Sequence, residues 1–247
     1  MVYTRGNAAD YDRWADHGNP GWSYRDVLPL FKQSENNQCF GATELRGVGG
    51  PLNVCYLRSP SPLNQAFIEA CESQGLPRTP DYNGTQQWGV APAQVTQKDG
   101  ERWSAAKGYL TPHRQRPNLQ VMTGVTAQRI VLESGVARQV HTVQGGKTQT
   151  VTARREIILS AGAFQSPAIL MRSGIGPAAH LQSLGIEVLR DLPGVGENLH
   201  DHPDAVLVAD APGHTDLIGL SPKGVWHTLQ ALWAWRQHRK GRLTTNF

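Results

Sequence analysis

The chain has 247 residues and a formal net charge of +4, from 24 basic and 20 acidic side chains. This length is enough for one large domain or two small ones with a substantial core. The basic excess is mild and spread out, which disfavours a nucleic-acid-binding protein, and the lack of a long apolar run excludes an integral membrane segment.

The cysteines bear on the cellular compartment. Cys39, Cys55 and Cys71 are too few and too widely spaced for a zinc site. An odd number of cysteines without a secretory signal favours a reducing cytosol. We therefore expect a cytoplasmic protein.

The first half of the chain is predicted to be helical and loop-rich. Capping residues, helical spacing of apolar residues and Gly-rich runs locate its elements. In chain order these are a helix at 8–18 closed by Gly18, a helix capped by Ser23, a loop at 36–60, a helix at 62–74 closed by Gly75, a turn-rich loop at 81–89 and a short helix at 104–113.

A β-rich block and an α/β unit are predicted next. The β-rich residue types and the Gly145-Gly146 turn favour strands and a hairpin there. The expected elements are strands at 119–123 and 127–132, a hairpin of 136–143 with 148–153, a buried strand at 154–160, helices at 166–173 and 178–184, and a strand at 186–189. Beyond Pro203 we expect a strand at 205–209, a loop to about residue 222 and an amphipathic helix near 222–240.

The most informative segment joins the buried strand to the helix after it. Ala161, Gly162 and Ala163 are small, so another group can approach their backbone closely. Ser166 is predicted to cap the following helix, with Pro167 at its first position. A strand, a close-approach turn and a short helix in this order are typical of a nucleotide-cofactor site.

Other chemical interpretations are weaker. Residues 174–179 match the G-x-G-x-x-A pattern, but a helix precedes them and Pro177 lacks an N–H for a phosphate. His200 and His202 are the two histidines that could share a face of a strand, and no third metal ligand is well spaced. Ser166 lacks the Gly-x-Ser-x-Gly elbow of a hydrolase.

The C-terminal tryptophans leave two interpretations open. Trp226, Trp233 and Trp235 lie close to the basic run 236–242. Aromatic and basic residues together suggest binding to a lipid surface. Packing of a helix onto the core explains the same tryptophans.

Ordered segments along nearly the whole chain resemble the glucose-methanol-choline (GMC) flavoprotein oxidoreductases, and in particular their choline-dehydrogenase-like branch. The segments that carry the resemblance are 1–14, 21–22 with 30–35, 116–124, 160–177, 191–202 and 241–247. The resemblance implies an α/β fold, with an incomplete FAD/NAD(P)-binding (Rossmann-like) domain at 1–204 that lacks its first strands. Residues 205–247 would begin an α+β substrate-binding domain.

The resemblance also implies a chemistry. GMC enzymes oxidise an alcohol by hydride transfer to FAD, with a histidine base and an acceptor that reoxidises the flavin. The implied FAD contacts are Met1, Val2 and Tyr3 on the isoalloxazine side, Val125 and Ala127 at the adenine, and Ser160, Ala161 and Gly162 at the adenosine end. The Gly-rich phosphate loop is expected before Met1 and the catalytic histidine beyond Phe247, so no catalytic residue and no metal ligand is assigned.

The sequence therefore leaves two functions open. The first is FAD-dependent oxidation of a small-molecule alcohol by a longer enzyme of which this chain is an internal fragment. The alternative is an inactive, truncated remnant that acts as a binding or structural protein. The sequence does not identify the alcohol or the electron acceptor, and it leaves open a peripheral association with the inner membrane.

Overall fold

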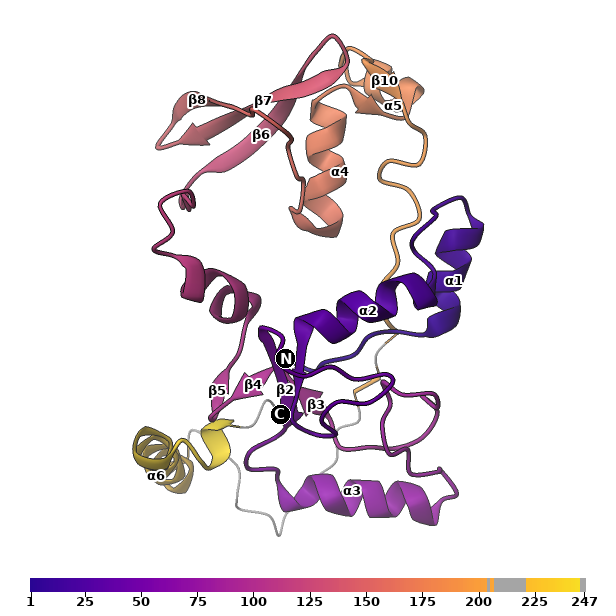
Figure 1. The fold of residues 1–247 in the computed structure, drawn as a ribbon. Coiled ribbons are helices and arrows are strands. Elements are labelled where there is room, and N and C mark those ends of the chain that lie inside the picture. Colours follow the sequence, from indigo (N-terminus) through magenta and orange to yellow (C-terminus); the bar gives the residue numbers. More distant parts are fainter. Residues whose placement is uncertain (204, 207–220, 245–247) are drawn as a thin grey trace. The chain divides into compact units, whose positions relative to one another are not determined.

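The computed structural model describes residues 1–203, 205–206 and 221–244 (Figure 1). Helices and strands are mixed along the chain, consistent with the expected incomplete α/β domain. The chain divides into two compact units: the first combines Met1–Leu119 with Asp210–Phe247, and the second is Gln120–Ala209.

The helices of the first unit begin at capping residues. The side chains of Ser23, Ser61 and Ser221 each accept a backbone N–H at the start of a helix. Gly18 and Gly75, both at φ +89°, follow the first and third helices. The helical segments of this unit are α1 (Ala8–Asp16), α2 (Tyr24–Ser34), α3 (Pro62–Ser73), the π-helical η1 (Ala106–Leu110), the 3₁₀ turn η2 (Thr111–His113), α6 (Pro222–His238) and the 3₁₀ turn η3 (Arg242–Thr244).

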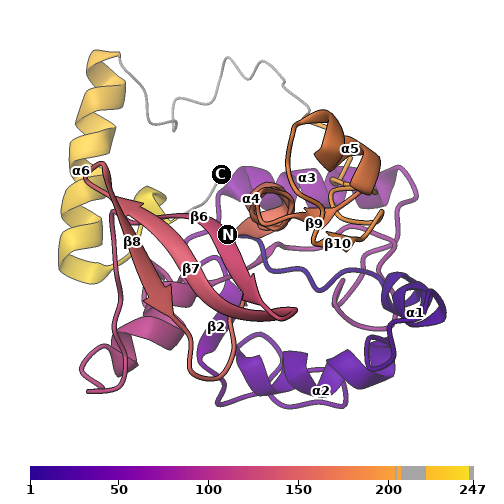
Figure 2. The ribbon, with the colours of Figure 1, turned by 90° about the horizontal axis from the view of Figure 1, so that it is seen from above.

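Short strands occupy the centre of this unit, and α2 and α3 lie on opposite sides of β2 (Figures 1 and 2). Strand β2 pairs in parallel with β1 and antiparallel with β3, while β4 and β5 form a separate antiparallel pair. The strands are β1 (Glu35–Asn37), β2 (Leu52–Tyr56), β3 (Gln94–Val95), β4 (Gln97–Lys98) and β5 (Glu101–Arg102).

The prediction of a loop at 36–60 was wrong, because the structure has strand β1 at the start of this segment and strand β2 within it. Gly47 allows the chain to return against α2, because an ideal Cβ there would lie 1.9 Å from the Lys32 carbonyl oxygen. The Gly47 carbonyl then accepts a hydrogen bond from Asn37 N at 2.9 Å. A Gly-rich sequence therefore brings two short strands together by close backbone approach.

The second unit contains an antiparallel sheet in the order β6-β7-β8. Gly145 and Gly146 have φ of 55° and 77°, so the predicted β7–β8 hairpin is confirmed. Helix α4 packs against β6, and β9 pairs in parallel with β10. The elements are β6 (Thr126–Glu133), β7 (Val136–Gln144), β8 (Lys147–Thr152), α4 (Gly162–Arg172), β9 (Ile175–Gly176), α5 (Ala178–Ser183) and β10 (Arg190–Asp191).

Three predicted strands were wrong. Residues 119–123 and 154–160 are not strands, and the strand expected at 186–189 occurs instead at 190–191. Ile158, predicted to be buried, is 78% exposed. An apolar, β-branched segment becomes a strand only where another backbone pairs with it, and no strand in the described residues pairs with 119–123 or 154–160.

Two further predictions concern helices and the C-terminal part. Helix α4 begins at Gly162 with Ala161 as its N-cap, so the predicted start at Ser166 and the first position for Pro167 were wrong. The helix expected near 222–240 is confirmed as α6. The strand at 205–209 and the loop that follows lie largely outside the described residues.

Candidate functional site

The predicted isoalloxazine contacts lie beside β3 in the first unit. Val2 forms an antiparallel bridge with this strand. Tyr3 N donates to the Gln94 carbonyl at 2.7 Å, and Thr96 N donates to the Met1 carbonyl at 3.0 Å. The backbone of Met1, Val2 and Tyr3 is therefore fixed, while the Val2 side chain stays 46% exposed. An exposed apolar side chain on a fixed backbone suits contact with a flat ring.

Two side chains from the 81–84 turn hold the Tyr3 carbonyl. Tyr82 Oη donates to it at 3.0 Å and Asn83 Nδ2 at 3.1 Å. Asn83 Oδ1 also accepts a hydrogen bond from Arg5 N at 2.7 Å. Burial raises the pKa of the Tyr82 phenol to about 12, which keeps it protonated and able to donate.

A buried ionic cluster lies beneath this segment. The Glu35 carboxylate is fully buried and accepts hydrogen bonds from Tyr3 Oη at 3.1 Å and Arg46 Nε at 2.9 Å. It also accepts a hydrogen bond from Arg5 Nη2. Arg46 Nη1 lies 3.1 Å from both carboxylate oxygens of Asp81. Two guanidinium groups and two carboxylates thus compensate one another out of water.

This cluster positions backbone and supplies no free acid or base. Burial raises the pKa of the Tyr3 phenol, and the Glu35 carboxylate beside it acts in the same direction. Sequence reasoning missed the cluster, because residues 5, 35, 46 and 81 share no motif or spacing. The one available signal was several charged residues in segments otherwise rich in Gly and turns.

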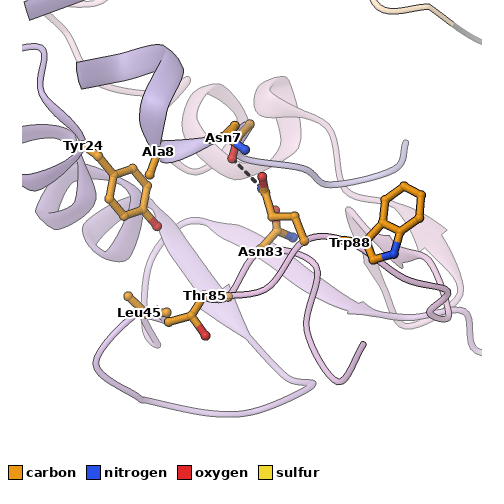
Figure 3. Close-up of a pocket in the computed structure, with 10 residues that line it drawn as sticks. Asn7, Ala8, Tyr24, Leu45, Asn83, Thr85 and Trp88 are labelled. Atoms are coloured by element: carbon orange, nitrogen blue, oxygen red, sulfur yellow. Dashed lines mark hydrogen bonds between the residues drawn. The ribbon is translucent and has the colours of Figure 1, made fainter. Parts of the chain in front are cut away.

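A cavity of about 430 Å³ adjoins the cluster (Figure 3). Aromatic and neutral polar groups line it, and Gln87 Nε2 donates to the Gly6 carbonyl at 2.8 Å across its wall. The lining comprises Gly6, Asn7, Ala8, Tyr24, Leu45, Asn83, Gly84, Thr85, Gln87 and Trp88. With neither histidine nor carboxylate in this lining, the cavity offers hydrogen bonding and stacking rather than acid–base chemistry.

The predicted adenine contacts lie on the edge strand β6 of the second unit. Ala127 pairs with Thr142 of β7, and the pairing shifts at a bulge immediately after it. Val125 directly precedes the strand. An edge strand presents unpaired backbone N–H and C=O groups, which match the donors and acceptors of an adenine ring. The contact of Val125 and Ala127 with adenine stays a prediction.

The turn before α4 is open. Ser160, Ala161 and Gly162 are all exposed. A Cβ added at Gly162, which has φ +88°, would meet nothing within 4 Å. No side chain caps α4 at its N-cap residue, although Ser166 Oγ accepts a hydrogen bond from Ala161 N at 2.9 Å. Free N–H groups at a helix N-terminus, together with the helix dipole, favour an oxygen-rich ligand group.

Side-chain hydrogen bonds join β6 to the C-terminal end of α4 in the second unit. Arg172 Nε donates to the Gln128 carbonyl at 2.8 Å, and Ser173 Oγ accepts from Ile130 N at 2.8 Å. These contacts lie at the C-terminal end of the helix, about 15 Å along its axis from Gly162. They fix the strand to the C-terminal end of the helix.

The histidine pair does not form a site. His202 Nδ1 lies 3.9 Å from the Asp201 carboxylate, and both side chains are almost fully exposed. In the part of the chain that the structure describes, no cluster of His, Cys, Asp and Glu could hold a metal ion. The same part contains no helix with the length and apolar character needed to cross a bilayer.

Comparison with known proteins matches this chain to one family and to several flavoenzymes. The family model described as GMC oxidoreductase matches residues 1–204. Two curated relatives, the oxygen-dependent choline dehydrogenases of Sinorhizobium medicae and Sinorhizobium fredii, are 48% and 49% identical over 202 residues. These matches cover 82% of this chain but 36% of each relative, so the chain spans about a third of their length.

Solved structures give the same result. An FAD-dependent oxidoreductase from Chaetomium thermophilum matches with a TM-score of 0.87 at 30% identity, covering 99% of this chain and 45% of that one. A pyridoxine 4-oxidase from Mesorbium loti matches with a TM-score of 0.72 at 38% identity, covering 78% of this chain and 38% of that one.

Proposed function

The chain belongs to the GMC oxidoreductase family, and from this premise we propose that it forms part of a longer FAD-dependent enzyme that oxidises an alcohol to an aldehyde or ketone. Choline is the first substrate to test, because the relatives described above are choline dehydrogenases. The observation that carries the proposal is the turn at Gly162. Its open space and uncapped helix N-terminus suit a dinucleotide cofactor.

FAD, when bound, supplies the hydride acceptor for the alcohol carbon. The residues of this chain bind and orient it. Met1, Val2 and Tyr3 would contact its isoalloxazine side from a backbone that β3, Tyr82 and Asn83 hold in place.

The adenosine half of the cofactor would use the second unit. Backbone groups at Val125 and Ala127 would hydrogen-bond the adenine, and Ser160, Ala161 and Gly162 would cover the adenosine end. We assign the histidine base and its partner to sequence beyond Phe247. Residues 1–204 would then be a partial FAD-binding domain, and 205–247 the start of the substrate-binding domain.

The location of the enzyme is also part of the proposal. Three cysteines without a disulfide among them favour a cytoplasmic enzyme. A peripheral association with the inner membrane is proposed in addition, from the aromatic and basic residues near the C-terminus. The electron acceptor is left unassigned, and neither nucleic acid nor an integral membrane segment is included.

Sequencing the DNA on both sides of the reading frame is the decisive first test. An in-frame extension that encodes a Gly-rich phosphate loop before Met1 is expected. Stop codons there would favour the inactive remnant instead. The extended protein should be yellow, and anaerobic addition of choline or another alcohol should bleach the flavin absorbance.

The contact at Gly162 can be tested in the same extended protein. Gly162→Val places a β-branched side chain where φ is +88°, so it should strain the turn and close the space predicted for the cofactor. The variant should retain much less FAD after gel filtration. Gly185→Val, also at positive φ with open space around it, is the matched control and should retain FAD.

A further inference from the structure

Helix α6 turns large apolar side chains away from the unit that holds it. Trp226 is 60% exposed, Leu229 54% and Trp233 63%, while Val225 and Leu232 are 47% and 49% exposed. Their spacings of three, four and seven residues place them on one side of the helix. We call these five residues the α6 outer face.

The opposite side of α6 packs against the β4–β5 turn. Ala231 is 5% exposed, and Trp235 Nε1 donates to the Gly100 carbonyl at 3.0 Å. Arg239 Nη1 lies 2.8 Å from a carboxylate oxygen of Glu101. The structure thus separates the tryptophans: Trp235 packs against the β4–β5 turn, whereas those of the outer face do not.

The charged side chains that α6 and the residues beside it carry have one sign, whereas Glu101 of β5 pairs with Arg239 on the other side of the helix. Residues 221–244 contain five basic and no acidic side chains. Lys223, Arg236 and Lys240 are exposed, and within the described residues none of the three forms an ion pair. An exposed apolar stripe with tryptophans and unpaired cations next to it complements a bilayer that has an anionic surface.

We propose that the α6 outer face binds the surface of an anionic lipid bilayer. Its apolar side chains enter the headgroup boundary, and Lys223, Arg236 and Lys240 contact lipid phosphates. This inference rests on the peripheral membrane association proposed above and identifies the surface responsible. It requires neither bound FAD nor turnover.

Flotation of the extended protein on a density gradient tests the proposal, because vesicles float and protein aggregates sink. The protein should float with vesicles of equal parts phosphatidylcholine and phosphatidylglycerol, and poorly with phosphatidylcholine alone. Trp226→Ser with Trp233→Ser should weaken binding by about tenfold or more. Lys223→Gln, Arg236→Gln and Lys240→Gln together should weaken it by on the order of a hundredfold at low salt.

Matched controls lie elsewhere in the same unit. Trp88, at 74% exposed, gives Trp88→Ser as the aromatic control, and Arg25, Arg114 and Arg116 give a triple Arg→Gln control. Both should float like the original chain. A tryptophan double variant that floats unchanged would overturn the α6 assignment and leave membrane association standing. A protein that never floats would overturn both the α6 assignment and the membrane association. A dimer seen by gel filtration and lost only in the tryptophan double variant would also overturn both.

Discussion

Glu35 is the fully buried carboxylate of the ionic cluster in the first unit. Its buried carboxylate contacts Arg5, Arg46 and Tyr3, so Glu35→Gln leaves two buried guanidinium groups with Asp81 as the remaining carboxylate of the cluster. Removing one partner of a buried ion pair costs about 3–5 kcal/mol. We expect a loss of this size in the free energy of unfolding, measured by urea titration of tryptophan fluorescence. The exposed Glu44 offers Glu44→Gln as the control, and equal stability of the two variants would contradict the prediction.

Cys39 provides a residue-scale prediction about pH. Burial raises the pKa of its thiol from 9.0 to about 12. At pH 9 an ordinary thiol is about half thiolate, whereas this one is about a thousandth thiolate. Because the folded state holds the proton more tightly, the stability linked to Cys39 is complete below pH 9 and is lost as the pH rises toward 12.

Alkylation measures the thiolate of Cys39 directly. Iodoacetamide at pH 9 should modify Cys39 more slowly in the folded chain than in urea, by a factor on the order of a hundred or more. Cys71, partly exposed on α3, reports access of the reagent in the same tryptic digest. Equal rates for Cys39 in the folded and unfolded chain would refute the assigned environment.

At the scale of elements, a buried hydrogen bond joins the end of α4 to β6 in the second unit. Ser173 Oγ accepts a hydrogen bond from Ile130 N at 2.8 Å and donates to the Ile169 carbonyl at 2.6 Å. Ser173→Ala leaves the Ile130 N–H buried and unpaired, which costs about 1–3 kcal/mol. Hydrogen exchange should show faster exchange of the Ile130 amide, while Ser183→Ala, an exposed helix-end change, should leave it unaffected.

Local signals explain which elements could be predicted. Helix α3 has a serine cap, apolar residues at helical spacing and a glycine at its end, and the β7–β8 hairpin has its Gly-Gly turn. Each of these signals lies within the element itself. Residues 154–160 have strand-like side chains, but a strand also needs a partner backbone, and nothing in the sequence states whether one is present.

The same distinction applies to the candidate site. The turn around Gly162 is a local motif, so its open backbone could be anticipated from the small residues Ala161, Gly162 and Ala163. The ionic cluster could not, because Glu35 and Asp81 meet Arg46 only after three segments fold together. Whether the predicted contacts hold FAD stays a prediction that the extended protein will test.

At the scale of the whole molecule, exposed apolar residues favour association between copies of the chain. In the second unit, Ile158 is 78% exposed, Phe164 74%, Val206 80% and Leu199 59%. Apolar surface of this extent favours association between molecules. The predicted FAD contacts are also divided between two compact units, so neither unit carries all of them.

We therefore expect the purified 247-residue chain to be colourless and prone to aggregation, even when refolded with excess FAD. The absorbance spectrum of its soluble fraction, read together with gel filtration, provides the measurement. A yellow, monomeric preparation with a flavin absorbance band would show that these residues alone form a complete cofactor site. The proposed dependence on further sequence would then be wrong.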